Sequence, residues 1–598
     1  MSSEVAKKEP KKFEPSPSFA KNLYVGKLEP AQVFPYPNPL SNEQKETVSM
    51  LTDPFEKFFQ EVNHPEINDA NEEIEAPTLN GLWDMGAFGI QVPEDLGGLG
   101  LSNTQYARLV EIVGKYDLAV GICLGAHQSI GFKGILLFGT PEQKKKYLPR
   151  VSTGKEYAAF CLTEPTAGSD AASIKSRAVL SPDGSHWILN GSKIWISNGG
   201  FAEIMTVFAQ TTVKNEETGV EKDAVTAFIV ERSFGGVTSG PPEKKMGIKA
   251  SNTTEVFYDN VKIPKENVLG GVGNGFKVAM QILNNGRFGM ASALAGTMRS
   301  ATAKAVEFAT QRLQFGQKIE KYATIQEKLA KMAMLQYVTE SLAYMISGNM
   351  DQGSTDYQVE AAISKCFASE SAWTVTDEAI QIMGGMGFMR HSGLEKVLRD
   401  LRIFRIFEGT NDILRLFVAL NGIQYLEKSL RQLQKEVKGV NLGVIFNEAQ
   451  KRASRQLNMG LGISTGNAVH SNFQNEVALL TKCIEKFGKC AETLILKYKR
   501  DILHEQCYLH RLAQATFDIY TMAVVLSRCT STLQKGLPSA PYEELLTKLW
   551  CHEASERAVL NLNMTEDKNY EKSFKNYSKV AGMICENGGL VQMNPLNI

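Results

Sequence analysis

The distribution of proline constrains this chain more than any other feature of its sequence. Eighteen of the 21 prolines lie at or before Pro264, and the next one is Pro538. Because proline interrupts α-helices, the 273 residues from 265 to 537 are predicted to be helical. This span is expected to divide near Gly422–Lys435 into two helical domains.

Length and composition limit the number of domains and the classes of partner. A chain of 598 residues is too long for one hydrophobic core and is expected to form about three or four domains. Its 65 Lys and Arg residues balance its 65 Asp and Glu residues, so no global charge favours nucleic acid. The nine cysteines form no C-x-x-C pair, which indicates a reducing compartment. No apolar run long enough to cross a bilayer and no secretory signal stands out.

The chain begins with an arm and a helical domain. Residues 1–45 contain seven prolines and no arginine, so we expect a disordered or extended arm without the features of an arginine-rich mitochondrial import signal. Apolar residues at spacings of three and four then predict a helical domain over residues 46–157. Within it, Gly121–Gly131 is rich in small residues. These residues either allow close helix packing or leave room for a long ligand.

A β-domain is predicted next, because the apolar period changes to two. Runs such as Met205–Ala209 and Ala227–Val230 suit strands of a sandwich or barrel, and turns are expected at Asn190-Gly191 and Asn198–Gly200. The expected fold is therefore mostly α with a central β-domain. Its parts are an N-terminal arm (1–45), an N-terminal helical domain (46–157), a β-domain (158–270), a helical bundle (271–425) and an additional C-terminal helical domain (426–598).

One carboxylate stands in an apolar run just before a predicted helix start. Thr410 is a suitable N-cap for a helix that closes at Asn421-Gly422. Glu408 then lies on the loop two residues before the helix, between Phe407 and Gly409. Poor solvation makes a carboxylate a stronger base than it is in water. Glu408 is therefore either a catalytic base or an acid that caps the helix.

Two polar loops of the β-domain could border a flat ligand. Phe160–Asp170 and Trp195–Asn198 place a tryptophan and several hydroxyls beside backbone amides, which suits the face and edge of a heterocycle. Each loop alone is also typical of an ordinary turn. No G-x-G-x-x-G follows a strand, no G-x-x-x-x-G-K-[ST] occurs, and the eight histidines lack ligand spacing. The sequence therefore indicates no Rossmann site, no phosphate-binding loop and no metal site.

Five motifs, in this order, resemble the acyl-CoA dehydrogenases. They are Cys161–Pro165 with Gly168–Asp170, Trp195–Asn198, Arg312 with Phe315-Gly316, Gln381–Gly387, and Phe407–Thr410. The resemblance covers about residues 45–425, and the additional helical region to Ile598 is most similar to the very-long-chain members of the family. It implies FAD-dependent oxidation of long or very-long-chain acyl-CoA to trans-2-enoyl-CoA, the first step of mitochondrial fatty acid β-oxidation.

The same resemblance assigns residues to the cofactor. FAD would lie between the β-domain and the helical bundle, and in a homodimer the far end of each cofactor would reach the partner chain. The implied FAD contacts are Phe160, Cys161, Leu162, Thr163, Ser169, Trp195, Ile196, Ser197, Arg312, Phe315, Gln381, Met383, Gly384, Gly385, Thr410, Asn411 and Asp412.

The resemblance also assigns the base and the substrate contacts. Glu408 would remove the proton α to the thioester carbonyl while the β-carbon delivers hydride to flavin N5. Relatives that place their base elsewhere carry a glutamate at the position matching Gly286, which leaves Glu408 as the candidate here. The implied substrate contacts are Ser169, Asn284, Asn285, Gly286, Arg287, Phe407 and Gly409. For Arg287, an ion pair within the bundle is the alternative.

Partners and location follow from the resemblance as well. Electron-transfer flavoprotein would accept the electrons, and the enzyme would lie on the matrix side of the mitochondrial inner membrane. Residues 440–460 place apolar residues on one side of a helix and three basic residues opposite, typical of an interfacial helix or of one packed in its domain. An acyl-CoA oxidase and a non-catalytic scaffold are the alternatives, although Pro595–Ile598 is not a serine-lysine-leucine peroxisomal signal.

Overall fold

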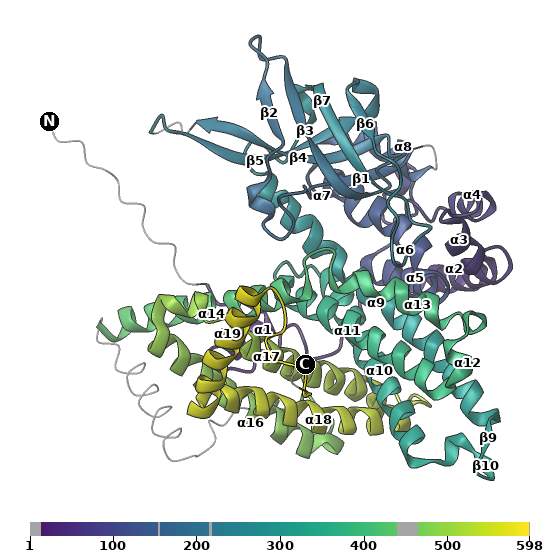
Figure 1. Ribbon diagram of the computed structural model, residues 1–598, viewed down its shortest axis with the longest axis vertical. Helices are drawn as coiled ribbons and strands as arrows, with labels where there is room; N and C mark the ends of the chain where they lie inside the picture. Colours follow the sequence, from purple (N-terminus) through teal and green to yellow (C-terminus); the bar gives the residue numbers. More distant parts are fainter. Residues whose placement is uncertain (1–13, 154–155, 215–217, 439–463, 597–598) are drawn as a thin grey trace. The chain divides into compact units, whose positions relative to one another are not determined.

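The computed structural model describes residues 14–153, 156–214, 218–438 and 464–596 (Figure 1). The chain forms two compact units, one of residues 37–414 and one that joins the segment up to Tyr36 to the residues from Arg415 onward. Helix α14 (Asn411–Lys438) begins in the first unit and continues into the second.

The larger unit begins with a helical domain, as the spacing of three and four between its apolar residues predicts. Its helices are α2 (Asn42–Glu61), α3 (Pro65–Asn71), α4 (Ala76–Asp84), α5 (Asn103–Tyr116), α6 (Leu118–Gly125), α7 (Lys133–Phe138) and α8 (Pro141–Ser152), with a π-helical turn at Ala126–Gly131. Phe59, Leu109 and Ile112 are buried in its core. Ser102 caps α5 by exchanging hydrogen bonds with Gln105, and Thr140 caps α8 in the same way with Gln143. These bonds pair backbone N–H groups that have no partner within the first turn of a helix.

One helical stretch of this domain did not stand out in the sequence. Among the described residues, Leu118–Phe138 is long and apolar enough to cross a membrane by length and composition, with a mean hydropathy of 1.3. Two thirds of it (67%) is buried inside the protein. It spans α6, the π-helical turn and α7, so its apolar character is used in the core of this domain.

The β-domain is one eight-stranded sheet, which Figure 1 shows as a layer of its own. Its strands are β1 (Ala158–Cys161), β2 (Arg177–Leu180), β3 (His186–Ser197), β4 (Ile204–Lys214), β5 (Glu221–Glu231), β6 (Val237–Ser239), β7 (Thr253–Pro264) and β8 (Val268–Leu269). They run in the order β6-β7-β3-β2-β4-β5-β8, and β1 pairs in parallel with β4. One face packs on helices through Ile204 and Phe208, while Met205 and Val207 join a core of residues from strands of the same sheet. The alternation along β4 therefore places a core on each side of the sheet.

The expected turn at Asn190-Gly191 is wrong. Both residues lie inside β3, where the pairing with β7 shifts register between Leu189 and Gly191. Gly191 has φ +145°, and a Cβ at this position would approach Ser176 Oγ to 2.3 Å. This glycine thus allows a bulge within one long strand.

Three long helices form the bundle that follows. They are α9 (Gly275–Gln311), α10 (Ala323–Asp351) and α11 (Gln358–Met383), with the hairpin β9 (Leu313–Gln314) and β10 (Gln317–Lys318) between α9 and α10. The short helices α12 (Gly385–Phe388) and α13 (Leu394–Leu401) follow α11. Helices α5 and α9 touch at two glycines. A Cβ on Gly114 of α5 would lie 2.0 Å from Ala293 O of α9, and a Cβ on Gly296 of α9 would lie 1.9 Å from Glu111 O of α5. Glycine is therefore what lets these two helices pack backbone to backbone.

The second unit contains α1 (Phe19–Leu23), α16 (Gln474–Tyr498), α17 (Gln506–Gln534), α18 (Ala540–Glu566) and α19 (Lys568–Asn587) with the main part of α14. The expectation of a disordered arm over residues 1–45 is wrong for the described residues 14–45. Phe19 and Leu23 are fully buried, and the Phe19 ring lies 5.9 Å from the Tyr520 ring. The predicted interfacial helix at 440–460 lies outside the described residues.

Helix α14 does not close at Asn421-Gly422, as the sequence suggested. Gly422 lies in its interior, where a Cβ would come within 2.1 Å of the Tyr24 ring. The Asn421 side chain donates to Phe417 O within the same helix (2.8 Å). The glycine therefore makes room for an aromatic ring from the N-terminal segment instead of ending the helix.

Candidate active site

The Glu408 loop joins a short 3-10 turn (Arg402–Arg405) to the start of α14. Thr410 Oγ1 accepts from the Ile413 N–H at 3.3 Å, and Thr410 O accepts from the Leu414 N–H at 2.9 Å, so the predicted N-cap is confirmed. Glu408 and Gly409 both have left-handed backbone, with φ +54° and +92°. This conformation is uncommon for a residue with a side chain and is often retained at functional sites.

Two buried cations hold consecutive carbonyls of this loop. Arg287 on α9 donates from Nη2 to Glu408 O (3.3 Å), and Lys365 on α11 donates from Nζ to Gly409 O (2.8 Å). Arg287 also donates from Nη1 to Asn284 Oδ1. The Arg287 contact reaches the backbone of Glu408 and leaves the carboxylate without a direct ion pair.

The carboxylate of Glu408 lies in a dry position. The residue as a whole is partly exposed, yet its Oε2 atom is buried and has no hydrogen-bond partner among the described residues. Burial raises the pKa of Glu408, and the charges of Arg287 and Lys365 oppose that rise. Because Oε2 is unpaired and poorly solvated, it is free to accept a proton from a ligand, which favours a base over a capping acid.

Of the implied substrate residues on α9, Arg287 contacts this loop, whereas Gly286 and Asn285 face other elements. A Cβ on Gly286 would contact Ser129 O (3.3 Å) in the π-helical turn, and the Ser129 hydroxyl bonds that of Tyr106 at 2.5 Å. Burial raises the pKa of Tyr106 to about 12, and the negative charge of Glu408 adds to the rise. The Asn285 Nδ2 donates to Tyr357 OH (3.2 Å), while its buried Oδ1 has no partner among the described residues.

The residues at the start of α14 differ in their surroundings. Asp412 is exposed, whereas Asn411 is buried and donates to Ser369 Oγ (2.9 Å) and Glu370 Oε1 (3.0 Å). Its Oδ1 accepts from Lys365 Nζ at 3.0 Å. The Asn411 side chain therefore bonds residues of α11 and supports the loop. Phe407 is half-buried against the Phe404 ring, 5.0 Å away in an edge-on arrangement.

The two polar loops of the β-domain are joined by a buried ion pair that the sequence did not reveal. Lys193 Nζ lies 2.7 Å from Glu164 Oε1 and donates to Leu162 O at 3.1 Å, and the Ile194 N–H donates to Thr163 O at 3.0 Å. Trp195 has φ +58° and is 62% exposed. This large exposed aromatic beside Thr163 offers the face that the sequence predicts for a flat ligand.

Several implied cofactor residues of the β-domain have buried side chains. Cys161, Leu162 and Ile196 are buried, Phe160, Thr163 and Ser197 are intermediate, and Ser169 is exposed. The Cys161 and Ile196 side chains belong to the core between strands. For these two residues, only the backbone is available to a ligand.

A separate hollow of ≈ 780 Å³ lies at the β9–β10 hairpin. Arg312, Phe315, Met383, Gly384 and Gly385 line it, together with neighbouring apolar residues, and Gln381 is exposed next to them. The Phe315 side chain is 94% exposed. The described contacts thus gather the implied residues into three groups: the Glu408 loop with α9, the two β-domain loops, and this hairpin hollow.

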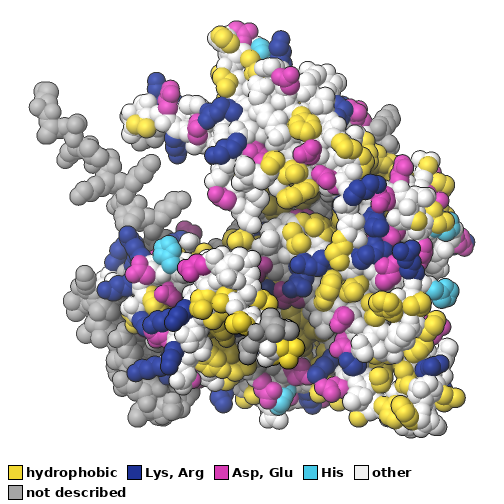
Figure 2. Space-filling view, in the orientation of Figure 1, with side chains coloured by type: hydrophobic (Ala, Val, Ile, Leu, Met, Phe, Trp, Pro, Cys, Tyr) yellow, Lys and Arg dark blue, Asp and Glu magenta, His cyan; other side chains and the backbone are white. Residues whose placement is uncertain are grey.

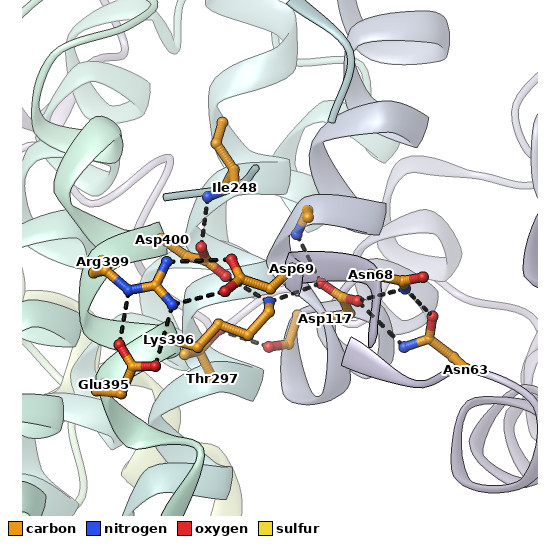
Figure 3. A network of polar contacts seen from close by, with 12 residues as sticks. Asn63, Asn68, Asp69, Asp117, Ile248, Thr297, Glu395, Lys396, Arg399 and Asp400 are labelled. Carbon is orange, nitrogen blue, oxygen red and sulfur yellow. Dashed lines mark hydrogen bonds and ion pairs between the residues drawn. The ribbon is translucent and has the colours of Figure 1, made fainter. Parts of the chain in front are cut away.

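A network of charges anchors the segment that leads to the Glu408 loop (Figure 3). Lys396 Nζ contacts Asp117 Oδ1 (3.3 Å) and Asp400 Oδ2 (2.7 Å), and all three side chains are buried. Arg399 pairs with Asp69 (2.8 Å), and Asp400 accepts from the Ile248 N–H. Helix α13 is therefore tied to the N-terminal helices and to a β-domain loop.

Comparisons with known proteins agree with the order of the domains. The Acyl-CoA dehydrogenase N-terminal, middle and C-terminal domain models match residues 45–155, 159–261 and 273–422. The ACAD9/ACADV C-terminal domain model matches residues 471–590. The very long-chain specific acyl-CoA dehydrogenase, mitochondrial, of Bos taurus is 57% identical over 597 residues, which cover 99% of this chain and 91% of the relative.

Solved structures show the same likeness. An acyl-CoA dehydrogenase complexed with FAD from Bacillus anthracis has a TM-score of 0.77 and 32% identity over 91% of each chain. A chain of the electron transferring flavoprotein structure from Acidaminococcus fermentans has a TM-score of 0.58 and 37% identity, and covers 64% of this chain and 97% of that chain. The fold, the ordered motifs and the matched domain models agree, and the chain belongs to the acyl-CoA dehydrogenase family.

Proposed function

We propose that this protein is an FAD-dependent acyl-CoA dehydrogenase that acts on long and very-long-chain substrates in fatty acid β-oxidation. The observation that carries the proposal is the Oε2 atom of Glu408, which is buried, has no hydrogen-bond partner among the described residues and is presented by a left-handed turn. Near full-length identity to a very-long-chain enzyme supports the substrate class.

The residues of this chain supply the proton chemistry. Glu408 Oε2 accepts the proton from the carbon α to the thioester carbonyl, and its dry position strengthens it as a base. In the described part of the chain, the Glu408 N–H donates no backbone hydrogen bond, so it is available to the substrate carbonyl oxygen as charge develops. Arg287 keeps the carbonyl of the same residue turned away toward α9.

The arrangement fits a bound flavin. Exposed Trp195 and the loop around Thr163 would hold the ring system, and Arg312 with Phe315 would hold polar and apolar parts of a cofactor bound to a partner chain. FAD supplies the hydride acceptor for the β-carbon.

The test of the proposed function is a product and acceptor assay. The purified protein should be yellow, release FAD on denaturation and convert palmitoyl-CoA to a product lighter by two hydrogens. Electron-transfer flavoprotein is the proposed acceptor, and the likeness to a chain of an electron-transferring flavoprotein structure supports it. Turnover that requires added acceptor fits a dehydrogenase, whereas equal turnover with oxygen alone and release of peroxide would indicate an oxidase.

A homodimer is proposed from the surface of the hairpin. Leu313, Phe315, Met386 and Phe388 are exposed by 62%, 94%, 49% and 76%. Figure 2 shows hydrophobic side chains on the part of the surface where Figure 1 places β9, β10 and α12. An exposed apolar group of this kind is typical of an interface.

Arg312→Ala is expected to lower the flavin content of the purified protein. Arg312 lines the hairpin hollow, and a guanidinium binds phosphate or other polar cofactor oxygens well. The loss of flavin should grow on dilution, because the proposed contact joins Arg312 of one chain to the flavin of the partner chain and dilution separates the two chains. The measurement is the ratio of flavin to protein absorbance before and after gel filtration, with Arg312→Lys as the control that keeps the charge. A flavin content equal to wild type at every dilution would contradict the role.

Gly125→Met is expected to lower activity on the longest substrates and spare shorter ones. A Cβ on Gly125 would meet nothing within 4 Å, and one on Gly121 would only contact Val113 (3.6 Å), so open space lies beside α6. A methionine would fill this space, whereas Gly125→Ala should leave the profile unchanged. The measurement is kcat/KM for octanoyl-, palmitoyl- and stearoyl-CoA. An equal loss on all three would show disturbed helix packing instead.

Association with the matrix face of the mitochondrial inner membrane is proposed through residues 440–460. The relatives are named mitochondrial, and the sequence places Phe446 and Leu457 on the apolar side of the candidate helix. The double variant Phe446→Glu/Leu457→Glu should float less with anionic liposomes than wild type, since its apolar side carries charge. Soluble activity serves as the folding control. Equal flotation would remove this segment from membrane binding.

A further inference from the structure

Lys365 is a buried cation for which the reaction described above gives no reason. Its side chain is 1% exposed, and it donates to Gly409 O (2.8 Å) and Asn411 Oδ1 (3.0 Å). Both acceptors are neutral, and within the described residues no carboxylate forms an ion pair with Nζ. Burying an ammonium group without a paired carboxylate is unfavourable. An apolar residue would be expected here if packing were the sole requirement.

One face of α11 holds the loop in addition to the contact from α9. Lys365 donates to the Gly409 carbonyl, and the neighbouring Cys366 Sγ lies 3.9 Å from the Asn411 carbonyl oxygen. One turn further on, Ser369 and Glu370 accept from Asn411 Nδ2 at 2.9 and 3.0 Å. These residues follow the helical spacing of four, so they act together on one short segment. The loop therefore has two rigid supports.

We propose that Lys365 is a positioning residue of the dehydrogenation, which holds the left-handed turn presenting Glu408 through the Gly409 carbonyl and favours the ionised form of that base by its charge. The inference rests on the proposed function. It is distinct from the role of Arg287, which contacts the Glu408 carbonyl from α9.

The charges around Lys365 support a direct influence on the base. Glu408 on the loop, Glu370 and Cys366 on α11, and Arg287 on α9 act on it, and burial lowers the pKa of Lys365 to about 8. In turn, the charge of Lys365 lowers the pKa of Glu408, against the effect of burial. Removing this charge must therefore raise the pKa of Glu408, so that the base becomes ionised only at a higher pH.

Two neutral variants separate the hydrogen bonds from the charge. K365Q keeps a neutral N–H donor on a side chain that is one bond shorter, whereas K365M keeps neither a donor nor the charge. K304M is the control for the loss of a lysine that donates to a backbone carbonyl: Lys304 on α9 is exposed and donates to Ser392 O at 2.7 Å, away from the Glu408 loop. Each holoenzyme is assayed with palmitoyl-CoA from acid to neutral pH. Hydrogen exchange of the peptide that covers residues 403–414 gives a readout independent of turnover.

The proposal predicts a different result for each variant. In both K365Q and K365M, the acid limb of kcat/KM should move up by about one pH unit, the lower end of the effect of a nearby charge. K365M should also lose about tenfold or more in kcat, with faster exchange of the loop peptide, since the turn loses its support. K304M should match wild type in all three measurements.

Two results would overturn the inference while leaving the proposed function intact. The first is that wild type is active and its kcat/KM falls on the acid side at the same pH as that of K365Q and K365M. The other is a K365Q that fails to fold or to hold flavin, which would show that the charge serves folding. Wild type without activity on any acyl-CoA would contradict the proposed function itself.

Discussion

Glu408→Gln should bind flavin and acyl-CoA as wild type does and lose about 10²–10⁴ in kcat, toward the upper end of that range. The amide preserves the size and shape of the side chain, so Arg287 and Lys365 keep their contacts with the loop carbonyls. What disappears is the unpaired Oε2 as a proton acceptor. Substrate binding should change little, because a base acts in the transition state of proton transfer and contributes little to the ground state.

The measurement is steady-state turnover of palmitoyl-CoA with flavin content as the internal standard. Glu427→Gln is the control, since Glu427 is on α14 in an exposed pair with Arg431 and belongs to the other compact unit. It should keep activity within about threefold of wild type. Activity of Glu408→Gln in that same range would remove Glu408 from the role of base.

The pH dependence has a defined direction. Because burial raises the pKa of Glu408, activity should fall on acidification at a higher pH than an ordinary glutamate of pKa about 4.3 would give. Below the raised pKa the carboxyl is protonated and accepts no proton. The acid limb should be absent from the residual activity of Glu408→Gln.

Lys396→Met should lower the free energy of unfolding by about 3–5 kcal/mol, because the change leaves the buried carboxylates of Asp117 and Asp400 with hydrogen bonds to neutral groups and without the cation that both contact. Lys396 contacts both carboxylates, and burial raises the pKa of Asp400 while Lys396 opposes the rise (Figure 3). Methionine fills a similar volume, so the loss reports charge more than packing. The measurement is the midpoint and slope of urea unfolding.

A double variant tests the stated cause. Lys396→Met/Asp400→Asn removes one of the two unpaired charges, and the asparagine oxygen can still accept from the Ile248 N–H. Part of the lost stability should therefore return. A single variant within about 1 kcal/mol of wild type, or a double variant that is less stable than the single one, would contradict the electrostatic account.

The sequence was sufficient where the decisive contacts are local. The N-cap of Thr410, the position of Glu408 outside the helix and the helical nature of the proline-free span depend on residues within a few positions of each other. The same is true of the strand alternation in β4. The structure confirms the cap, the place of Glu408 and the alternation in β4, and the described part of the proline-free span is helical apart from the short strands β8, β9 and β10.

Sequence reasoning failed where a distant residue decides the local structure. Gly422 was expected to end a helix, but the Tyr24 ring, nearly four hundred positions away, occupies the space above it. The N-terminal arm was expected to be disordered because its prolines dominate the pattern, yet Phe19 packs near Tyr520. In both cases the deciding contact joins the N-terminal segment to a residue beyond position 414.

The supports of the base were missed for a similar reason. Lys365 stands in an ordinary helical sequence, and only the fold brings it to Gly409, 44 positions later. Lys193 and Glu164 likewise form their pair across 29 positions. A lysine in a predicted helix or strand is usually solvated. Burial is what marks Lys365 and Lys193 as supports of the site, and burial depends on the tertiary structure.

The most direct test of the central claim is anaerobic mixing of the purified flavoprotein with palmitoyl-CoA while the flavin absorbance is followed. Wild type should bleach and yield the 2-enoyl-CoA without any added acceptor, and Glu408→Gln, loaded with the same flavin, should stay yellow over the same time. Bleaching of both proteins at similar rates would contradict the claim that Glu408 removes the α-proton.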